Sequence, residues 1–287
     1  IGKIPMNAVI SYVDGNDPLW QQDYRAVTRQ PALVKRYRDW GTLPFLLRGI
    51  QRHMPFIGRV FLVVARESQV PAWADRSHLQ MVLHADIIPP AYLPTFNSTA
   101  IEMFLHRIPG LDRRFIYLND DTIPVLPCRE EDFFEGECIR RGFARHLFPF
   151  GKFRRIVRGN DSLARRAAGK GPGFFFIRPQ HTASPMFRDV CEELFAKAGP
   201  EMLSSITRFR DSRNISQYVF PDYLYYGGRV KPGRLSNRHF SLATATPEAL
   251  AAFLAAPDRK WVCINDVEMP EGRCDEFRAV ISKAVAK

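Results

Sequence analysis

The sequence of 287 residues lacks a long hydrophobic run, because uninterrupted apolar stretches such as Val60 to Ala65 are only a few residues long. A helix needs about 20 apolar residues to cross a bilayer, so no transmembrane segment is predicted. The first residues, Ile1 to Pro5, also lack the basic and apolar segments of a signal peptide, and none is predicted there. A composition with 46% hydrophobic and 25% charged residues indicates an ordinary globular protein.

Cysteine is scarce. The five cysteines include no C-x-x-C pair, which argues against a zinc ribbon or a full disulfide framework and favours a reducing compartment. Cys128 and Cys138 bracket an acidic loop, and sequence alone leaves open whether these two residues pair.

Several motifs of well-known enzyme classes are absent. The sequence contains no Gly-rich phosphate loop of either standard spacing and no G-x-S-x-G motif. These absences disfavour Walker-type NTPases, simple Rossmann dehydrogenases and α/β-hydrolases.

Acidic residues are outnumbered, with 30 Asp and Glu against 41 Lys and Arg, a formal net charge of +11. Such a balance favours an anionic partner: nucleic acid, a phosphorylated substrate or an acidic membrane surface. Residues 139–170 contain ten Lys and Arg but only one acid, Asp161. We interpret 139–170 as a basic insertion, either a mobile solvated segment or a surface that attracts a polyanionic acceptor.

Apolar strands alternate with amphipathic helices in the first half of the chain. Strands are expected at 7–13, 59–65, 79–84, 114–118, 173–177 and 261–264, and helices at 43–53, 97–107, 185–197, 216–226, from 246 and at 274–286. This order predicts an α/β fold, with a mixed, mostly parallel central sheet and flanking helices, in a single catalytic domain over 1–287. Ligands of such folds bind beyond the carboxyl ends of the strands.

Acids follow two of these strands. Asp14 and Asp17 lie in a turn after the first strand, and Asp120 and Asp121 follow the strand at 114–118. Carboxylates suit hard divalent cations, so Asp120 and Asp121 are predicted to bind Mg²⁺ or Mn²⁺. The alternative is a solvated turn or a helix cap.

One histidine and two arginine clusters are candidates for phosphate chemistry. His181 lies between a strand and a helix, a position suited to a general base, although a lone histidine there is often structural. Arg38 and Arg210 each belong to an Arg-aromatic-Arg string that fits phosphate recognition or an ordinary solvated surface.

Four stretches, in order along the chain, carry a family resemblance. The first is Ile10-Ser-Tyr-Val-Asp-Gly-Asn-Asp-Pro18, and the second includes Leu93-Pro-Thr-Phe-Asn-Ser98 and Phe115-Ile-Tyr-Leu-Asn-Asp-Asp121. The third begins at His181 and the fourth is Lys260-Trp-Val-Cys-Ile-Asn-Asp266. Together they resemble the Stealth family of sugar-phosphate transferases, which includes bacterial capsular polysaccharide phosphotransferases and the catalytic core of lysosomal N-acetylglucosamine-1-phosphotransferase.

The sequence departs from the family pattern at three places. The usual H-x-P-H of the third block is His181-Thr-Ala-Ser184, so the second histidine is replaced by serine. Trp40 and Val267 stand where the second and fourth blocks usually carry asparagine. Donor or acceptor preference is therefore open.

The resemblance implies a fold like that of GT-A and Rossmann-type nucleotide-sugar enzymes. It also implies transfer of a hexose or N-acetylhexosamine 1-phosphate from a nucleotide-diphosphate sugar to a saccharide hydroxyl, with release of a nucleoside monophosphate. On this reading His181 is the base, Arg38 and Arg210 stabilise the phosphate, and Asp121 holds the metal with Asp120. The implied substrate-binding residues are Asp14, Gly15, Asp17, Asn97, Asn160, Arg188, Ser212 and Asn265.

The implied partners are the sugar donor and an oligo- or polysaccharide acceptor, expected to be anionic, without nucleic acid. The expected location is cytoplasmic, with peripheral association at the inner face of the plasma membrane. A GT-A type glycosyltransferase that releases a nucleoside diphosphate is the alternative enzyme, and a non-enzymatic binder of nucleic acid or anionic membranes is the alternative of another class.

Overall fold

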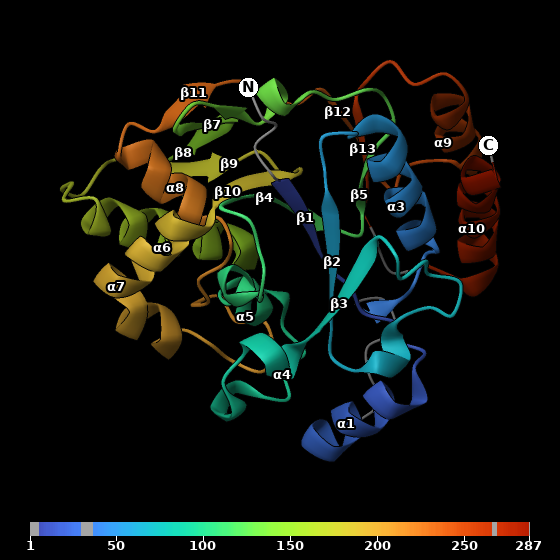
Figure 1. The fold of residues 1–287 in the computed structure, drawn as a ribbon, viewed down its shortest axis with the longest axis horizontal. Helices are drawn as coiled ribbons and strands as arrows, with labels where there is room; N and C mark the ends of the chain where they lie inside the picture. Colours follow the sequence, from blue (N-terminus) through green and yellow to red (C-terminus); the bar gives the residue numbers. More distant parts are fainter. Residues whose placement is uncertain (1–5, 30–36, 266–268, 287) are drawn as a thin grey trace.

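A five-stranded sheet forms the centre of the computed structural model, which describes residues 6–29, 37–265 and 269–286. Its strands lie in the order β10-β4-β1-β2-β3. Their bounds are β1 Met6–Ser11, β2 Arg59–Val64, β3 Leu79–Leu83, β4 Arg114–Asn119 and β10 Ser184–Phe187. The first four are mutually parallel and β10 pairs antiparallel with β4, which confirms the predicted α/β class with a mixed, mostly parallel sheet (Figure 1).

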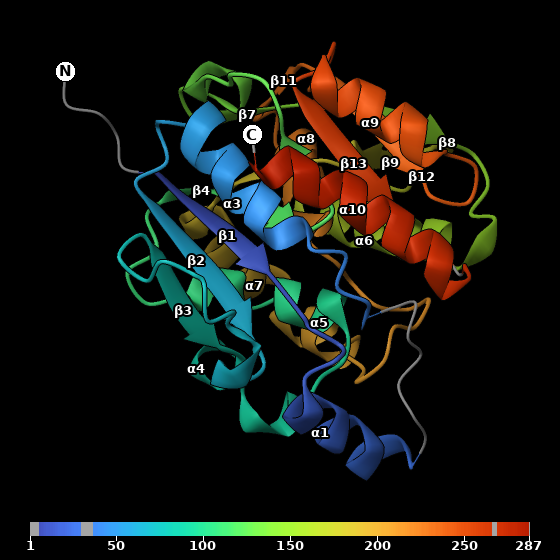
Figure 2. The same ribbon diagram turned by 90° about the vertical axis from the view of Figure 1, so that its right-hand side faces the viewer.

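Helices cover both faces of this sheet, as its apolar strands require. In Figure 2, α3 (Thr42–His53) lies in front of β1, and α7 (Arg188–Ser204) lies behind it. The remaining helices are α1 Pro18–Thr28, α4 His84–Ile87, α5 Ser98–Glu102, α6 Gly151–Ala167, α8 Val219–Tyr226, α9 Pro247–Ala255 and α10 Glu271–Ala286.

Three smaller sheets surround the central one. A three-stranded sheet in the order β12-β13-β5 begins directly after β4, because β5 (Thr122–Pro124) pairs antiparallel with β13 (Trp261–Asn265). The other strands are β6 Phe134–Glu135, β7 Cys138–Arg141, β8 Phe143–His146, β9 Phe176–Pro179, β11 Val230–Pro232 and β12 Asn237–Ser241.

The basic segment 139–170 has regular secondary structure. It contains most of β7, then β8 and the 17-residue helix α6. Ile156, Val157 and Leu163 of α6 are buried. Their helical spacing buries one face of α6, while its exposed basic residues occupy the other.

Several predicted elements have different bounds, and three of them concern the surroundings of the site. The helix expected over 97–107 ends at Glu102, and the strand expected over 173–177 begins only at Phe176. The helix expected from Pro185 begins at Arg188, because Ser184 to Phe187 pair with β4. Sheet pairing here determines a boundary that local sequence signals do not show.

The five cysteines are free thiols, so Cys128 and Cys138 do not pair. Among the residues that the structure describes, no helix is both long and apolar enough to cross a membrane. Arg36 and Asp266, which belong to two of the matched motifs, lie outside the described residues.

Replacing Phe187 by alanine tests the role of β10 in the fold. The Phe187 side chain is fully buried and its ring lies 5.2 Å from that of Phe134. We expect Phe187→Ala to lower the free energy of unfolding by about 3–5 kcal/mol, because it leaves a cavity beside the central sheet. Urea denaturation measures this change. The matched control is Phe174→Ala, a change at a 93% exposed ring, and an equal loss in both variants would contradict the assignment.

Candidate active site

A cleft of about 850 Å³ lies at the carboxyl ends of the parallel strands. Its wall includes Tyr12 after β1, Ala65 after β2 and Asp120 after β4. This is the edge where ligands of open α/β sheets bind. Of the strand-end acids selected from the sequence, Asp120 and Asp121 line this cleft, whereas Asp14 and Asp17 are not part of its wall.

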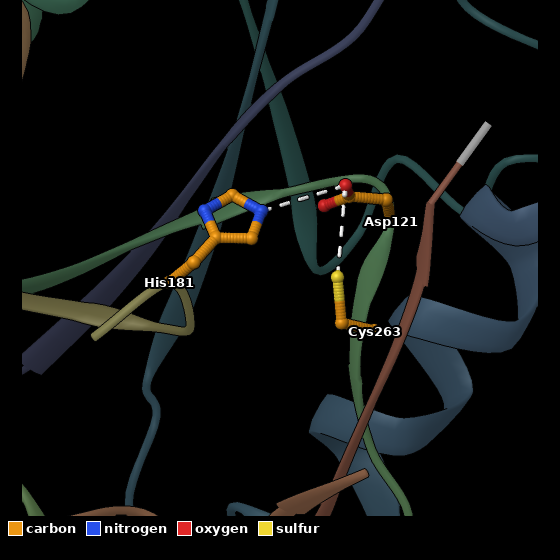
Figure 3. Close-up of side chains that lie close together, drawn as sticks. All are labelled: Asp121, His181 and Cys263. Carbon is orange, nitrogen blue, oxygen red and sulfur yellow. Dashed lines mark hydrogen bonds and ion pairs between the residues drawn. The ribbon is translucent and has the colours of Figure 1, made fainter. Parts of the chain in front are cut away.

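Asp121 and His181 line this cleft, and the fully buried Cys263 lies next to them (Figure 3). The His181 Nε2 atom is 3.6 Å from Asp121 Oδ2, and the Cys263 Sγ atom is 3.9 Å from the same oxygen. Asp121 lies between β4 and β5, His181 lies between β9 and β10, and Cys263 belongs to β13. Strand pairing brings the three together, since β10 joins β4 and β13 joins β5.

His181 and Asp121 shift each other's protonation. Burial acts to lower the pKa of His181, but the carboxylate of Asp121 outweighs it, and the pKa of His181 is raised. Burial acts to raise the pKa of Asp121, but His181 outweighs it in turn, and the pKa of Asp121 is lowered. The pair therefore favours an ionised aspartate beside a histidine that titrates above its ordinary range.

Tyr218 fixes the other side of the imidazole. Its hydroxyl lies 3.0 Å from Nδ1 of His181, within hydrogen-bond distance. Because the tyrosine is buried, this contact holds the ring orientation and leaves Nε2 facing Asp121. Sequence reasoning missed Tyr218, since only the packing of α8 against β9 and β10 places it here.

Glu102 is a second functional candidate, which the sequence analysis did not select. Its spacing from Thr99 is that of a helix-capping box, but the cap of α5 is the Asn97 side chain, which accepts from the Thr99 N–H. The Glu102 carboxylate lines the cleft and accepts from the Gln217 backbone N–H at 2.9 Å. Burial raises the pKa of Glu102 to about 7, although the Gln217 hydrogen bond and the charge of Arg210 act to lower it. The sequence signal that could have identified Glu102 is an acidic residue within an otherwise apolar helical stretch.

The acids after β1 and β4 share one environment. Burial, then Asp39, Asp14 and Asp120, raise the pKa of the Tyr12 phenol, which donates a hydrogen bond to Asp39 at 3.2 Å. Asp120 lines the cleft itself. The structure thus brings Asp14 and Asp120 into the same electrostatic region, as their positions at adjacent strand ends predict.

Asp17 and Gly15 have structural contacts in this turn. The Asp17 carboxylate caps α1 by accepting from the Leu19 N–H, and it also accepts from the Ser68 hydroxyl. A Cβ atom on Gly15 would lie 2.3 Å from the Tyr37 carbonyl oxygen, so only glycine fits there. Neither residue is part of the cleft wall, in contrast to the substrate contacts implied by the resemblance.

Arginines from three elements line the cleft. The Arg210 guanidinium donates to the Ser98 hydroxyl, and Arg38 lies over the Trp40 ring at 5.2 Å and 3.8 Å from Glu271. Arg178 of β9 also lines the cleft and was not selected from the sequence. The predicted pair Arg38 and Arg210 thus faces the same cavity as His181.

The other predicted contacts divide between the cleft and the interior. Asn97 and Asn265 line the cleft, and the Asn97 amide also donates to Thr207 and Asn214. Asn160 is fully buried in α6, where it accepts from the Ser216 N–H and donates to the Ile156 carbonyl. These bonds satisfy its amide, so a substrate contact by Asn160 is a prediction that the structure does not support.

Arg188 and Ser212 also lie outside the cleft wall. The Arg188 guanidinium donates to the Leu111 carbonyl at the start of α7. Ser184, which replaces the second histidine of the family motif, is fully buried in β10 opposite Tyr117. This substitution therefore changes the sheet beneath the cleft rather than its wall.

Asp120 and Asp121 both line the cleft, and carboxylates are the hard oxygen ligands that Mg²⁺ and Mn²⁺ prefer. Asp121, His181 and Cys263 also lie within 4.8 Å of one another. Burial raises the pKa of the Cys263 thiol, which disfavours the thiolate that metal binding requires. The carboxylates are therefore the better ligands.

Comparison with known proteins shows what the chain is similar to. The family described as Stealth protein CR2, conserved region 2, matches residues 36–141. A receptor polysaccharide phosphotransferase of Streptococcus oralis is 39% identical over 90% of this chain and 89% of its own length. An exopolysaccharide phosphotransferase of Streptomyces coelicolor is 34% identical over 92% of this chain, which spans 47% of that protein.

Solved structures give a weaker likeness. An inositol-1-phosphate CTP transferase of T. maritima has a TM-score of 0.47 and 14% identity, covering 99% of this chain and 97% of its own. A galactosyltransferase solved with donor and acceptor sugar analogues has a TM-score of 0.43 and 12% identity, covering 97% and 95%.

Glu102→Gln should change how stability depends on pH. In the folded protein the pKa of Glu102 rises from its ordinary value of 4.5 to about 7, so ionisation disfavours the folded state. The penalty is absent below about pH 4.5, grows as the pH rises and is complete above about pH 7. Relative to the wild type, the glutamine variant should therefore gain up to about 3 kcal/mol between pH 4.5 and 8.

Urea denaturation of both proteins across this pH range measures the difference. A matched control is Glu201→Gln, an exposed acid on α7, whose effect should not change with pH in this way. A stability difference between Glu102→Gln and the wild type that is constant with pH would contradict the raised pKa.

Proposed function

The chain belongs to the Stealth family, and from that premise we propose that it transfers a sugar 1-phosphate from a nucleotide-diphosphate sugar to a saccharide hydroxyl. Relatives that are named capsular, exopolysaccharide or receptor polysaccharide phosphotransferases support synthesis of a surface polysaccharide as its setting. The observation that carries the proposal is the His181–Asp121 pair, which lies in a strand-end cleft together with three arginines.

The proposed reaction exchanges one bond to phosphorus for another. The acceptor hydroxyl oxygen attacks the β-phosphorus of the donor, and the bond from that phosphorus to the bridging oxygen breaks. The bridging oxygen leaves with the nucleoside monophosphate, and the sugar phosphate becomes a phosphodiester to the acceptor. Such a transfer depends on positioning and on neutralising phosphoryl charge.

His181 is the proposed base. Nε2 faces the cleft beside Asp121, while Tyr218 holds Nδ1. When Nδ1 donates to the tyrosine hydroxyl, the lone pair of Nε2 is available to take the proton of the attacking hydroxyl. Asp121 stabilises the imidazolium that results, which is the same interaction that raises the pKa of His181.

The cations around the cleft would neutralise the negative charge of the phosphoryl groups. Asp120 and Asp121 would hold Mg²⁺ or Mn²⁺, which supplies charge neutralisation on the diphosphate when bound. Arg38, Arg178 and Arg210 line the same cavity and would bind the phosphoryl oxygens. Asn265 offers an amide group for the sugar, whereas the Asn97 amide is already bonded to Thr99, Thr207 and Asn214.

Two further parts of the proposal concern the surroundings of the enzyme. The exposed basic face of α6 would attract an acceptor chain that carries negative charge. A cytoplasmic location with peripheral membrane association remains the expectation drawn from the family.

Chromatography of the nucleotide products tests the reaction. We expect the protein, incubated with UDP-, GDP- or CDP-linked sugars, Mg²⁺ or Mn²⁺ and short saccharide acceptors, to release the nucleoside monophosphate. Attack at phosphorus requires that product, whereas cleavage at the anomeric carbon releases a diphosphate. Diphosphate release would overturn the proposal in favour of a glycosyltransferase, and His181→Ala is the control for contaminating activity.

Tyr218→Phe tests how His181 is positioned. The variant keeps the buried ring but loses the hydroxyl that holds Nδ1. We expect kcat to fall by about 10-fold or more, since mispositioned general bases lose much of their contribution, and the acidic limb of the pH profile to shift. Tyr225→Phe, a change two turns along α8, should leave both quantities unchanged. An unchanged pH profile in Tyr218→Phe would refute the positioning role.

A further inference from the structure

Large apolar side chains are exposed on two short segments that flank α6. Leu147, Phe148 and Phe150 precede the helix and are 52%, 61% and 72% exposed. Phe174 and Phe175 follow it and are 93% and 48% exposed. Single exposed apolar residues are common, but a group of four phenylalanines and one leucine marks an interaction surface.

Strand register places the two segments side by side. In the antiparallel pair β8 and β9, His146 is opposite Phe176. The chain therefore continues from β8 into Leu147 and Phe148 next to the point where Phe174 and Phe175 lead into β9. The rings of Phe148 and Phe150 are 5.7 Å apart. We call these five residues the aromatic patch.

Basic side chains surround the aromatic patch. Exposed cations occupy the end of β8 and the first two turns of α6: Arg145, Lys152, Arg154, Arg155 and Arg158. Asp161, the only acid in this segment, is buried and bonded to Arg165 and Tyr226. It therefore does not neutralise the outer face. In Figure 2 the connection from β8 to α6 lies at the periphery of the molecule, remote from α1.

We propose that the aromatic patch and its basic border form a docking surface for an anionic lipid bilayer. Phenylalanine and leucine enter the boundary between headgroups and acyl chains, while lysine and arginine bind anionic headgroups. A glycan would be a poorer occupant, because phenylalanine and leucine side chains cannot donate or accept the hydrogen bonds that sugar hydroxyls make.

The docking surface adjoins the active-site cleft. Phe153, in the first turn of α6, is 45% exposed, lines the cleft and lies 6.2 Å from the ring of Tyr218. A bilayer against the patch would therefore lie near the cleft. This consequence rests on the proposed function. If both hold, the acceptor is a saccharide carried on a membrane lipid.

Sedimentation with vesicles of phosphatidylcholine, with or without phosphatidylglycerol, tests the surface without requiring turnover. We expect binding to the anionic vesicles only. The double variant F148S/F150S should lower the partition coefficient about 10-fold or more, since two rings leave the interface. The variant R154Q/R155Q should also weaken binding and flatten its salt dependence. The matched control is Trp73→Ser, a 53% exposed aromatic residue elsewhere, which should bind like the wild type.

Several outcomes would overturn the proposal. These are no binding of the wild type to anionic vesicles, equal binding by F148S/F150S, or a concentration-dependent dimer that only the aromatic patch supports. Loss of affinity for a soluble anionic oligosaccharide, with vesicle binding intact, would assign the surface to a glycan instead. Turnover of a soluble acceptor by F148S/F150S should match the wild type, so failure of the proposed reaction is detected separately.

Discussion

The parallel pairing of β1 with β4 is the constraint on which the site depends. It aligns two strand ends, so that the acids following β1 and β4 lie around one phenol, that of Tyr12. The turn after β4 then leads into β5, a strand of a different sheet. Asp121 therefore stands where two sheets meet, and each sheet contributes a further side chain: His181 from the connection to β10 and Cys263 from β13.

The part of the site that follows from this pairing could be predicted from the sequence. Buried strands have recognisable apolar runs, and polar residues directly after them must lie at one edge of a parallel sheet. Asp120 and Asp121 meet that condition, because they directly follow β4, a strand of the parallel sheet. His181 does not, since it follows β9, which pairs antiparallel with β8 in a separate sheet, and it reaches Asp121 only because β10 pairs with β4.

Residues that reach the site through tertiary packing could not be found in this way. Glu102 has the spacing of a capping-box acid, but Asn97 provides the cap, and Glu102 turns to the buried Gln217 N–H more than 100 positions along the chain. Tyr218 depends on how α8 packs against the central sheet. The reverse also occurs: Asp17 and Asn160 are polar residues that the resemblance implies as substrate contacts, yet hydrogen bonds to backbone groups occupy both side chains. A motif identifies a residue, whereas only packing shows which way its side chain points.

Helix α6 shows how one element can serve two surfaces. Its buried face, with Ile156 and Val157, packs into the protein, and its first turn carries Phe153 to the cleft and to Tyr218. Tyr218 in turn contacts His181, so two side-chain contacts link Phe153 to the proposed base. Any movement of the first turn of α6 would also move the Phe153 ring, because Phe153 belongs to that turn. The basic character of residues 139–170 therefore follows from how α6 packs. Phe153 and Ile156 of this helix form part of the cleft wall, and the same packing leaves Arg154, Arg155 and Arg158 exposed to solvent.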